Sequence, residues 1–293
     1  MFQTCLKIFN LAVDRQAGQV KMTDKKKNIK GIILAGGTAT RLFPLTATTS
    51  KQLLPVYDRQ MIFYPLNTLI KAGVKDILII VSPEHSGQFL NLLGLIFEDL
   101  GVHLEFMVQS VPRGLADAFI IGEEFIDDDN VVMILGDNII EDDISESIKN
   151  FEKGGLIFTK EVDDPERFGV VEFNNDGKVL SIEEKPENPK SNFISVGAYV
   201  YDSRVVEISK SLKSSARGEL EIVDIHKKYL EMDELKIKKI EGAWLDAGTF
   251  DSLLEASKVV KERGISDNFD IKMKKSIEKF NFNLKELARK KLV

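Results

Sequence analysis

From residue 30 onward, short apolar segments alternate with longer segments of helical pattern. Four segments are apolar and mostly rich in β-branched residues, as buried strands are: Gly31–Leu34, Asp76–Val81, Leu104–Val108 and Val131–Leu135. The helical pattern covers about Met61–Lys71, His85–Leu95 and Leu115–Glu124. This alternation predicts parallel strands joined by crossover helices. Ligands of such sheets bind beyond the carboxyl ends of the strands, so the turns after these strands are the expected place of a site.

After Phe151 the pattern changes to strand-like segments in quick succession: Leu156–Lys160, Gly169–Phe173, Lys178–Glu183 and Phe193–Tyr201. The run Asn174–Gly177 between two of them is a strong hairpin-turn signal. We therefore predict an α/β fold, a three-layer Rossmann-like sandwich whose mostly parallel central sheet is extended by antiparallel strands in the second half. Three further helices are predicted, the last with Thr249 as its N-cap: Arg204–Ser211, Leu220–Glu231 and Phe250–Glu262.

The chain is expected to have three parts. Residues 1–29 read as an N-terminal extension, poorly ordered or non-essential, because Met22 directly precedes a Lys run and the first strand. Residues 30–263 are the expected catalytic domain, and residues 264–293 a short helical tail. Apolar residues of the tail are spaced 4, 3, 4, 3: Met273, Ile277, Phe280, Leu284 and Leu287. This stripe predicts a helix that docks on the body or forms an oligomer contact, and we expect a homo-oligomer.

Composition indicates an ordinary globular protein and excludes several classes. The chain is 43% apolar and 29% charged, and its net charge of −6 argues against a general nucleic-acid binder. One cysteine and three scattered histidines indicate neither a disulfide framework nor a zinc cluster. No apolar run approaches the ~20 residues that span a bilayer. We expect a cytoplasmic protein with small-molecule substrates and with neither nucleic acid nor membrane as a partner.

The turn after the first strand has the chemistry of a phosphate site. Gly36 and Gly37 follow the buried strand, and two separated cations, Arg41 and Lys51, come after them. A glycine-rich turn lets backbone N–H groups approach an anion closely, and the two cations suit a triphosphate. The spacing matches neither the P-loop nor the dinucleotide fingerprint, so a different class of phosphate binder is indicated.

Two aspartates lie in turns where a metal could be bound. Asp137 follows the strand that ends at Leu135, and Asp246 follows a short apolar run before a turn that contains Gly248. Each acid alone could be a helix cap. Two carboxylates from separate loops are a reasonable ligand pair for Mg²⁺, which takes few protein oxygens and leaves its other positions to phosphate and water.

Two further motifs suggest how organic ligands could be recognised. The amide of Gln109, at the end of a strand, offers a donor and an acceptor that match the imide edge of thymine or uracil, and Gly114 would let the backbone approach the base. Glu184 and Lys185 lie in a charged run after another strand, where the acid could bind sugar hydroxyls and the lysine a sugar phosphate. A solvated charge run is the plainer interpretation of this second motif.

Longer segments of the chain carry a family resemblance: Ser50–Asp58, Met61–Leu66, Asp164–Phe173, Lys190–Asn192 and Arg217–Ile222. Taken with the turns above, they closely resemble the sugar nucleotidyltransferase family, and within it the enzymes that form dTDP-glucose and pyrophosphate from dTTP and α-D-glucose 1-phosphate. The similarity extends over about residues 30–258.

The resemblance implies a role for each matching position. Residues of the first turn would lie against the nucleotide: Leu34, Ala35, Gly36 and Gly37. Arg41, Lys51 and Lys185 would be the catalytic cations, and Gln109 and Gly114 would recognise the base. Asp137 and Asp246 would hold Mg²⁺. The glucose 1-phosphate would contact Asn138, Gly169, Glu184, Lys185 and Val196, with Glu219 nearby.

The sequence departs from the family pattern at several positions. Ala39 replaces a glycine usual in the first turn, and we expect it to be harmless with φ below zero. Phe168 lacks the hydroxyl of the usual tyrosine, and Arg113 stands where an acid is usual. Asp142 and Asp143 follow where family members often carry Tyr-Gly-His.

Three other functions are weighed against this one. A related pyrophosphorylase could use UTP or another sugar 1-phosphate, because thymine and uracil share the imide edge. A catalytically silent nucleotide-sugar sensor would be consistent with Ala39 and Phe168, but both cations and both aspartates are retained. A Rossmann oxidoreductase is disfavoured by the missing dinucleotide fingerprint.

Overall fold

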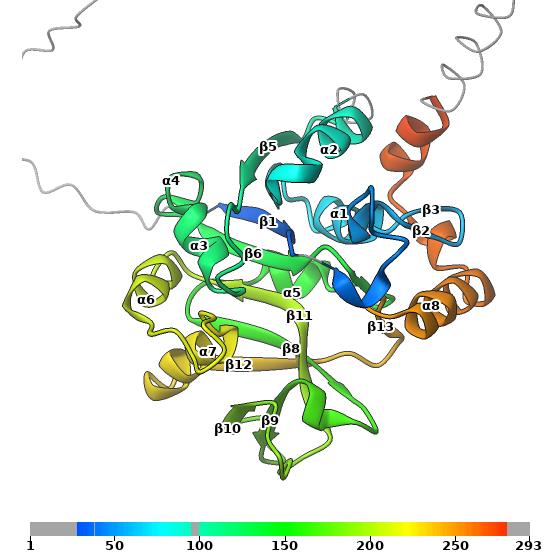
Figure 1. Cartoon of the computed structure of the whole chain (residues 1–293). Coiled ribbons are helices and arrows are strands. Elements are labelled where there is room, and N and C mark those ends of the chain that lie inside the picture. The colour runs from blue at the N-terminus through cyan, green and yellow to red at the C-terminus, as the bar shows by residue number, and fades with distance from the viewer. Residues whose placement is uncertain (1–27, 38, 95–99, 280–293) are drawn as a thin grey trace, which may run out of the picture.

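A nine-stranded sheet runs through the centre of the computed structural model, which describes residues 28–37, 39–94 and 100–279 (Figure 1). Its parallel part is the predicted one: β1 (Ile29–Ala35), β4 (Asp76–Val81), β5 (His103–Val108) and β6 (Asn130–Leu135). The strand order β6-β1-β4-β5 places the carboxyl ends of all four strands at one edge.

The second half of the chain extends this sheet with antiparallel strands, as predicted. These are β8 (Gly155–Glu161), β9 (Gly169–Phe173), β10 (Val179–Glu184) and β11 (Phe193–Tyr201). The long strand β11 joins the halves, because it pairs with β6, β8 and β9. A further strand, β12 (Leu235–Lys239), runs parallel to β8 at an edge and was missed by the sequence analysis.

Two short strand pairs lie outside the main sheet. One is a hairpin of β2 (Pro55–Val56) and β3 (Arg59–Gln60). The other joins β7 (Asn138–Ile140) to β13 (Trp244–Asp246), segments more than a hundred residues apart in the sequence. Short 3₁₀ turns lie at Thr40–Leu42, Lys51–Leu53, Pro83–His85, Pro165–Arg167 and Ile265–Asn268.

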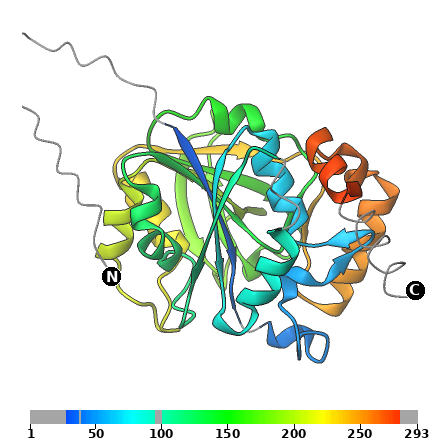
Figure 2. The ribbon, with the colours of Figure 1, turned by 90° about the horizontal axis from the view of Figure 1, so that it is seen from above.

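Helices cover both faces of the sheet, which makes the three layers that the sequence predicted (Figure 2). One face packs against α1 (Phe63–Lys71), α2 (Ser86–Leu93), α5 (Ser145–Lys149) and α8 (Phe250–Glu262). The other packs against α3 (Asp117–Ile121), α4 (Glu123–Ile126), α6 (Val205–Ser211) and α7 (Ile222–Glu231).

The two helix layers explain why consecutive residues of β1 are apolar. Ile33 and Ala35 face the first layer of helices, whereas Ile32 and Leu34 face the second. A strand covered on both faces needs apolar residues at every position rather than at alternate ones. The single helix expected over 115–124 is instead α3 and α4, which meet at Gly122. A Cβ there would lie 3.2 Å from the side chain of Ile32, so this helix pair approaches the sheet closely.

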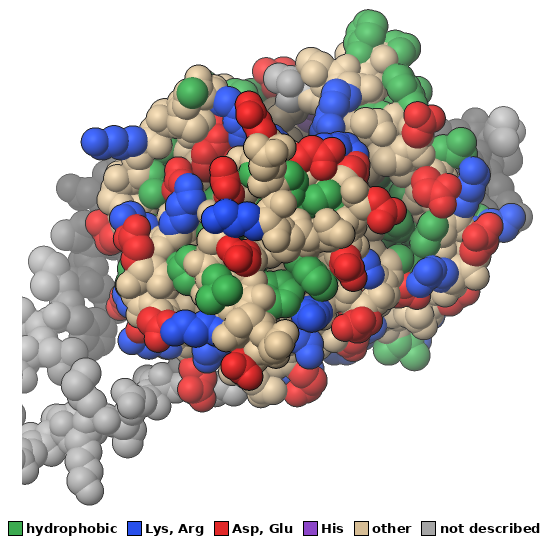
Figure 3. Space-filling model, turned by 90° about the horizontal axis from the view of Figure 1, so that it is seen from below, with side chains coloured by type: hydrophobic (Ala, Val, Ile, Leu, Met, Phe, Trp, Pro, Cys, Tyr) green, Lys and Arg blue, Asp and Glu red, His purple; other side chains and the backbone are tan. Residues whose placement is uncertain are grey.

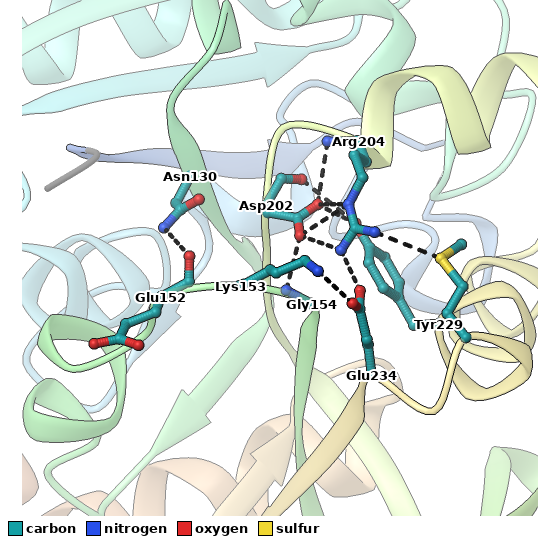
Figure 4. Close-up of polar contacts among 9 residues, drawn as sticks. Asn130, Glu152, Lys153, Gly154, Asp202, Arg204, Tyr229 and Glu234 are labelled. Carbon is teal, nitrogen blue, oxygen red and sulfur yellow. Dashed lines mark hydrogen bonds and ion pairs between the residues drawn. The ribbon is translucent and has the colours of Figure 1, made fainter. Parts of the chain in front are cut away.

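A cluster of polar contacts joins elements at the edge opposite the carboxyl ends of the parallel strands (Figure 4). The carboxylate of Asp202, just after β11, accepts hydrogen bonds from Gly154 N at 2.8 Å and from Tyr229 Oη at 3.0 Å. Arg204 pairs with Asp202 at 2.6 Å and also with Glu234, which precedes β12. These contacts hold the pKa of Asp202 below its usual value in spite of burial, which alone would raise it.

The described residues include the first part of the tail in which the apolar stripe was predicted. Residues 271–279 are helical, Met273 is buried, and Ile277 packs on the core, while the remaining stripe residues, Phe280, Leu284 and Leu287, lie outside the described residues. Among the described residues, no helix is long and apolar enough to cross a membrane. On the face in Figure 3, acidic and basic side chains are interspersed.

His226 of α7 is fully buried against the rings of Tyr199 and Tyr201. Neither ring nitrogen has a hydrogen-bond partner among the described residues. Burial disfavours the imidazolium and lowers the pKa of His226 to about 3. The folded protein therefore keeps this ring neutral at pH values where the unfolded chain, with an ordinary pKa of about 6.5, takes up a proton.

We predict that His226→Leu makes stability less dependent on pH between 7 and 5. In the wild type, the contribution of a neutral His226 is complete above the unfolded pKa and is lost as pH falls from about 6.5 toward 3, by at most roughly 1.4 kcal/mol per pH unit. Urea unfolding at pH 7 and pH 5 measures the effect. Equal slopes for wild type and H226L would contradict the assignment.

Candidate active site

Two adjoining cavities lie at the carboxyl ends of the parallel strands, where the sequence predicted a site. The larger is about 410 Å³ and the smaller about 240 Å³. Four residues line both cavities: Leu115, Leu135, Asp137 and Glu219. A ligand with two parts could therefore occupy both cavities at once, with its junction beside Asp137.

The smaller cavity is built from the turns after β1, β5 and β6. Leu34, Gly36, Gly37 and Lys51 line one side, and Gln109 and Gly114 line another. Gly37 and Gly114 have φ of 96° and 103°, which favour glycine. A Cβ on Gly114 would also lie 2.5 Å from the carbonyl oxygen of Leu220, so no larger residue fits there.

Gln109 is held by a residue that the sequence analysis did not single out. Its Nε2 donates to Asp117 Oδ2 at 2.9 Å, and a Cβ on Gly36 would lie 3.2 Å from its Oε1. Asp117 is buried on α3 and also accepts from Arg113 at 2.8 Å. The amide is therefore fixed with its oxygen toward the Gly36 turn of the cavity.

Asp137 stands where the cavities meet and is paired with Lys51. Lys51 Nζ forms an ion pair and hydrogen bond with Asp137 Oδ2, and Asn138 Nδ2 donates to Oδ1 at 3.0 Å. Burial would raise the pKa of Asp137, but the charge and hydrogen bond of Lys51, with that of Asn138, lower it. The carboxylate is therefore ionised and its negative charge is matched by one lysine.

The pairing of β7 with β13 brings Asp246 beside Asp137, because Asp246 lies opposite Asn138 in the register. Burial raises the pKa of Asp246, and the negative charge of Asp137 raises it further. Arg41 lies near Asp246, and its positive charge partly offsets these two effects on the pKa of Asp246. A Cβ on Gly248 would lie 3.1 Å from both Arg41 Nη2 and Asp246 Oδ1, so glycine leaves room for this approach.

The two aspartates fit a divalent cation such as Mg²⁺. Asp137 supplies carboxylate oxygens from the turn before β7 and Asp246 from β13, and their mutual repulsion is what a cation would relieve. Among the described residues no cluster of three or more His, Cys, Asp or Glu side chains forms a complete metal site. A pair of carboxylates is nevertheless the usual protein share for Mg²⁺, which keeps waters and substrate phosphates as its other ligands.

The larger cavity is lined by both charged and aromatic side chains. Glu184 pairs with Lys185 at 3.5 Å and with Arg217 at 3.3 Å, and both cations line the cavity. Lys185 has φ of 45°, and its N–H donates to Phe168 O at 2.9 Å. The ring of Phe168 meets that of Trp244 edge to face, with centroids 5.4 Å apart. The cavity thus offers cations for an anion and ring faces for a sugar.

Asn138 holds three parts of the site together. Its Oδ1 accepts from Gly197 N of β11 at 3.0 Å and from Trp244 Nε1 at 2.6 Å, while its Nδ2 donates to Asp137. A Cβ on Gly197 would lie 2.7 Å from the Asn138 side chain, so this contact requires glycine. The amide therefore sets the positions of Asp137 and Trp244 relative to the main sheet.

Most of the residues expected at the site line one of the two cavities. Gly169, Glu184 and Lys185 line the larger cavity with Asn138, Arg41 and Asp246. Ala35 and Val196 are buried and line neither cavity, so only their backbone could contact a ligand.

Several further cavity residues had no role in the sequence analysis, among them Arg167, Ser195, Tyr199, Arg217 and Trp244. The signal for Arg217 was present, because it begins the segment Arg217–Ile222 that carried the family resemblance.

The expectation for Ala39 was wrong. Ala39 adopts φ 46° and ψ 37°, the left-handed conformation, rather than φ below zero. The 3₁₀ turn that carries Arg41 begins at the next residue, so the chain must turn sharply here to direct the arginine toward the site. The left-handed conformation of an L-residue with a Cβ costs roughly 1–2 kcal/mol.

Comparisons with known proteins show which sequences this chain resembles. A family model described as "Nucleotidyl transferase" matches residues 30–263. The chain is 51% identical over 239 residues to a glucose-1-phosphate thymidylyltransferase of Neisseria meningitidis, covering 80% of this chain and 83% of the relative. It is 50% identical over 238 residues to the enzyme of that name from Mycolicibacterium smegmatis, covering 80% and 82%.

Solved structures give the same result for the fold. A candidate glucose-1-phosphate thymidylyltransferase from Bacillus anthracis, solved with sucrose, has a TM-score of 0.77 and 42% identity, covering 84% of this chain and 99% of that chain. A UDP-glucose pyrophosphorylase solved with UDP-glucose has a TM-score of 0.71 at 21% identity, covering 80% and 99%, and shows the likeness of fold alone.

We predict that Ala39→Gly stabilises the protein by about 0.5–1 kcal/mol, because glycine adopts the left-handed conformation without the Cβ clash but loses more backbone entropy on folding. Chemical unfolding measures the change. Ala47→Gly is the matched control in the same loop, where φ is not positive, and should be destabilising. If A39G lowered stability as much as A47G, the left-handed conformation would not be the strained feature described above.

Proposed function

The chain belongs to the nucleotidyl transferase family, and from this premise we propose that it acts as a glucose-1-phosphate thymidylyltransferase. It transfers a thymidylyl group from dTTP to α-D-glucose 1-phosphate and releases pyrophosphate. The observation that carries this proposal is the identity of about half of the residues over four fifths of the chain with enzymes of that name. We infer that residues 30–263 carry the activity, the same residues that the family model matches.

The smaller cavity suits the nucleotide. Gln109 Oε1, oriented by Asp117, can accept the imide N–H of the base, and Gly114 allows the base to lie against the backbone. The Gly36–Gly37 turn can donate backbone N–H groups to phosphates, and Leu34 lines the same cavity, with Ala35 behind it. Glu219 lines both cavities, near the boundary between nucleotide and sugar phosphate.

The larger cavity suits glucose 1-phosphate. Lys185 and Arg217 can bind the phosphate, and Glu184, which orders both cations, can accept hydrogen bonds from sugar hydroxyls. Trp244 and Phe168 can pack against the sugar ring beside Asn138. Gly169 has no side chain, so the sugar ring can lie close to its backbone. Val196 could take part only through its backbone.

The reaction proposed is an in-line displacement at the α-phosphorus of dTTP. A phosphate oxygen of the sugar phosphate forms the new P–O bond, and the bond from the α-phosphorus to the bridging oxygen of pyrophosphate breaks. The attacking oxygen is already ionised near pH 7, so no protein group needs to remove a proton. The main barrier is the repulsion between two anions, which Arg41, Lys51 and Lys185 lower by approaching from three sides.

We propose Mg²⁺ as the metal, held by Asp137 and Asp246. When bound, it would act as a Lewis acid at the phosphate oxygens and neutralise charge that develops on the leaving group. Lys51 pairs with Asp137 in the structure described here. A cation at the two carboxylates would take over this neutralisation, which would allow Lys51 to turn toward the phosphates of the nucleotide.

A UTP-using enzyme is the second candidate, because the imide edge that Gln109 can recognise is common to thymine and uracil. Rates of pyrophosphate release with dTTP, UTP, CTP and ATP, each against several sugar 1-phosphates, distinguish the two. The proposal expects dTTP with glucose 1-phosphate to give the highest kcat/KM. Faster turnover with UTP would favour the second candidate, and no release with any pair would contradict both.

We predict that Lys51→Ala lowers kcat by about 10²–10³-fold, the usual effect of removing one preorganised charge from a transition state. Steady-state rates with saturating dTTP, glucose 1-phosphate and Mg²⁺ measure it. The control Lys258→Ala removes an exposed lysine of α8 and should be fully active. A K51A protein with near-normal kcat would remove Lys51 from the mechanism.

We predict that Asp246→Asn separates metal binding from stability. Without metal, the substitution should leave the melting temperature unchanged or raise it, because it removes repulsion with Asp137 and the burial of a charge. Mg²⁺ should raise the melting temperature of the wild type and of the control Asp128→Asn, but not that of D246N. A normal Mg²⁺ shift in D246N would show that Asp246 is not a ligand.

A further inference from the structure

Two carboxylates hold the backbone turn that leads into β13. Asp142 Oδ2 accepts the N–H of Glu241 at 3.0 Å, and Asp142 Oδ1 accepts that of Gly242 at 2.6 Å. Glu141 Oε2 accepts the N–H of Ala243 at 2.6 Å. Three consecutive N–H groups therefore point at two adjacent carboxylates, and charge-assisted hydrogen bonds of this kind are about twice as strong as neutral ones.

We call Glu141 and Asp142 the carboxylate clamp. Other contacts fit the turn closely to these two carboxylates. A Cβ on Gly242 would collide with Asp142 Oδ1 and lie 3.0 Å from Glu141 Oε2, so the turn is shaped around the two carboxylates. Arg263, just after α8, donates to Glu141 Oε2 at 2.8 Å and partly balances its charge. The backbone N–H of Glu141 donates in turn to Ala243 O at 2.9 Å.

The clamp is adjacent to the site but does not belong to it. Neither Glu141 nor Asp142 lines either of the two cavities described above. The residue that follows the clamped turn is Trp244, which lines the larger cavity, and Asp246 lies two residues further on. The clamp thus acts on backbone immediately before two residues that face the substrate.

The clamp matters because it adds to the other contacts that hold β13 in register, which are the pairing with β7 and the hydrogen bond from Trp244 Nε1 to Asn138 Oδ1. Among the described residues β13 pairs with β7 alone, over three residues, and this pair is separate from the nine-stranded sheet. An isolated two-stranded pair is marginal in water. A slip of one residue would turn the side chains of β13 to its other face, so that Asp246 would no longer lie beside Asp137.

We propose that Glu141 and Asp142 are positioning residues for the reaction, which fix Trp244 and Asp246 in the cavity by clamping the turn at residues 241–243. This inference rests on the proposed function for its effect on catalysis. Its effect on Trp244 can be measured separately, because Trp244 is the only tryptophan of the chain and its fluorescence reports on that position alone.

The test compares Asp142→Asn with the wild type. An amide keeps the shape of the side chain but presents an NH₂ group to N–H donors, so the clamp should open. We expect kcat/KM for glucose 1-phosphate to fall about 10–100-fold, as is typical when a second layer of hydrogen bonds around a site is lost. The emission maximum of Trp244 should shift at a temperature well below unfolding.

Three variants serve as controls for this experiment. Glu241→Gln removes an equal charge from an exposed side chain of the same turn and should behave as the wild type. Asp142→Glu keeps the carboxylate and should recover part of kcat/KM and of the emission. Glu141→Gln tests the other half of the clamp and should reproduce both effects, including in the case that D142N does not fold.

The possible outcomes separate this inference from the proposed function. If the wild type is active and D142N and E141Q match it in kcat/KM and in Trp244 emission, the inference is wrong and the proposed function stands. If E241Q is as impaired as D142N, charge in the turn rather than the clamp is responsible, and the inference is again wrong. A wild type without thymidylyl transfer would contradict the proposed function, and with it the catalytic role of the clamp.

Discussion

The close approach of like charges is the constraint on which this site depends. Asp137 and Asp246 lie near each other in a partly buried place, and the pKa of Asp246 is raised by burial and by its neighbour. Lys51 compensates Asp137, and Arg41 lies near Asp246. The same cations suit the proposed reaction, in which a sugar phosphate must approach a triphosphate. A site that tolerates two repelling carboxylates is thus arranged to bring two repelling anions together.

The fold separates what stabilises the protein from what serves this site. At one edge of the sheet, Arg204 pairs with Asp202 and Glu234. None of these residues lines either of the two cavities. At the other edge, the glycine-rich turns and the small β7–β13 pair carry the charged residues. Non-glycine residues with positive φ occur at both edges, at Ala39 and Lys185 beside the site and at Asp127 and Asp233 at the opposite edge. Strain of this kind persists only where surrounding structure holds it.

Several elements of the fold could be predicted from the sequence, because their signals lie in short stretches of the chain. Short apolar segments identified β1, β4, β5 and β6, and Thr249 capped α8 through its contact with Ser252, as expected. The missed strand β12 has only two apolar residues among lysines, because an exposed edge strand is protected by charge rather than buried. Ala39 was misjudged because its conformation is imposed by the turn around it, and nothing in the residue itself signals a positive φ.

The sequence by itself determined the class of fold, the order of its elements and the residues that could bind phosphate and metal, since periodicity and residue chemistry are local properties. Only the tertiary structure decided which of them meet. It brought Asp246 beside Asp137 through the pairing of β13 with β7, oriented Gln109 through Asp117, and assigned Glu141 and Asp142 to the turn before Trp244. These contacts join residues distant along the chain or depend on a backbone shape, and neither is encoded in a local pattern.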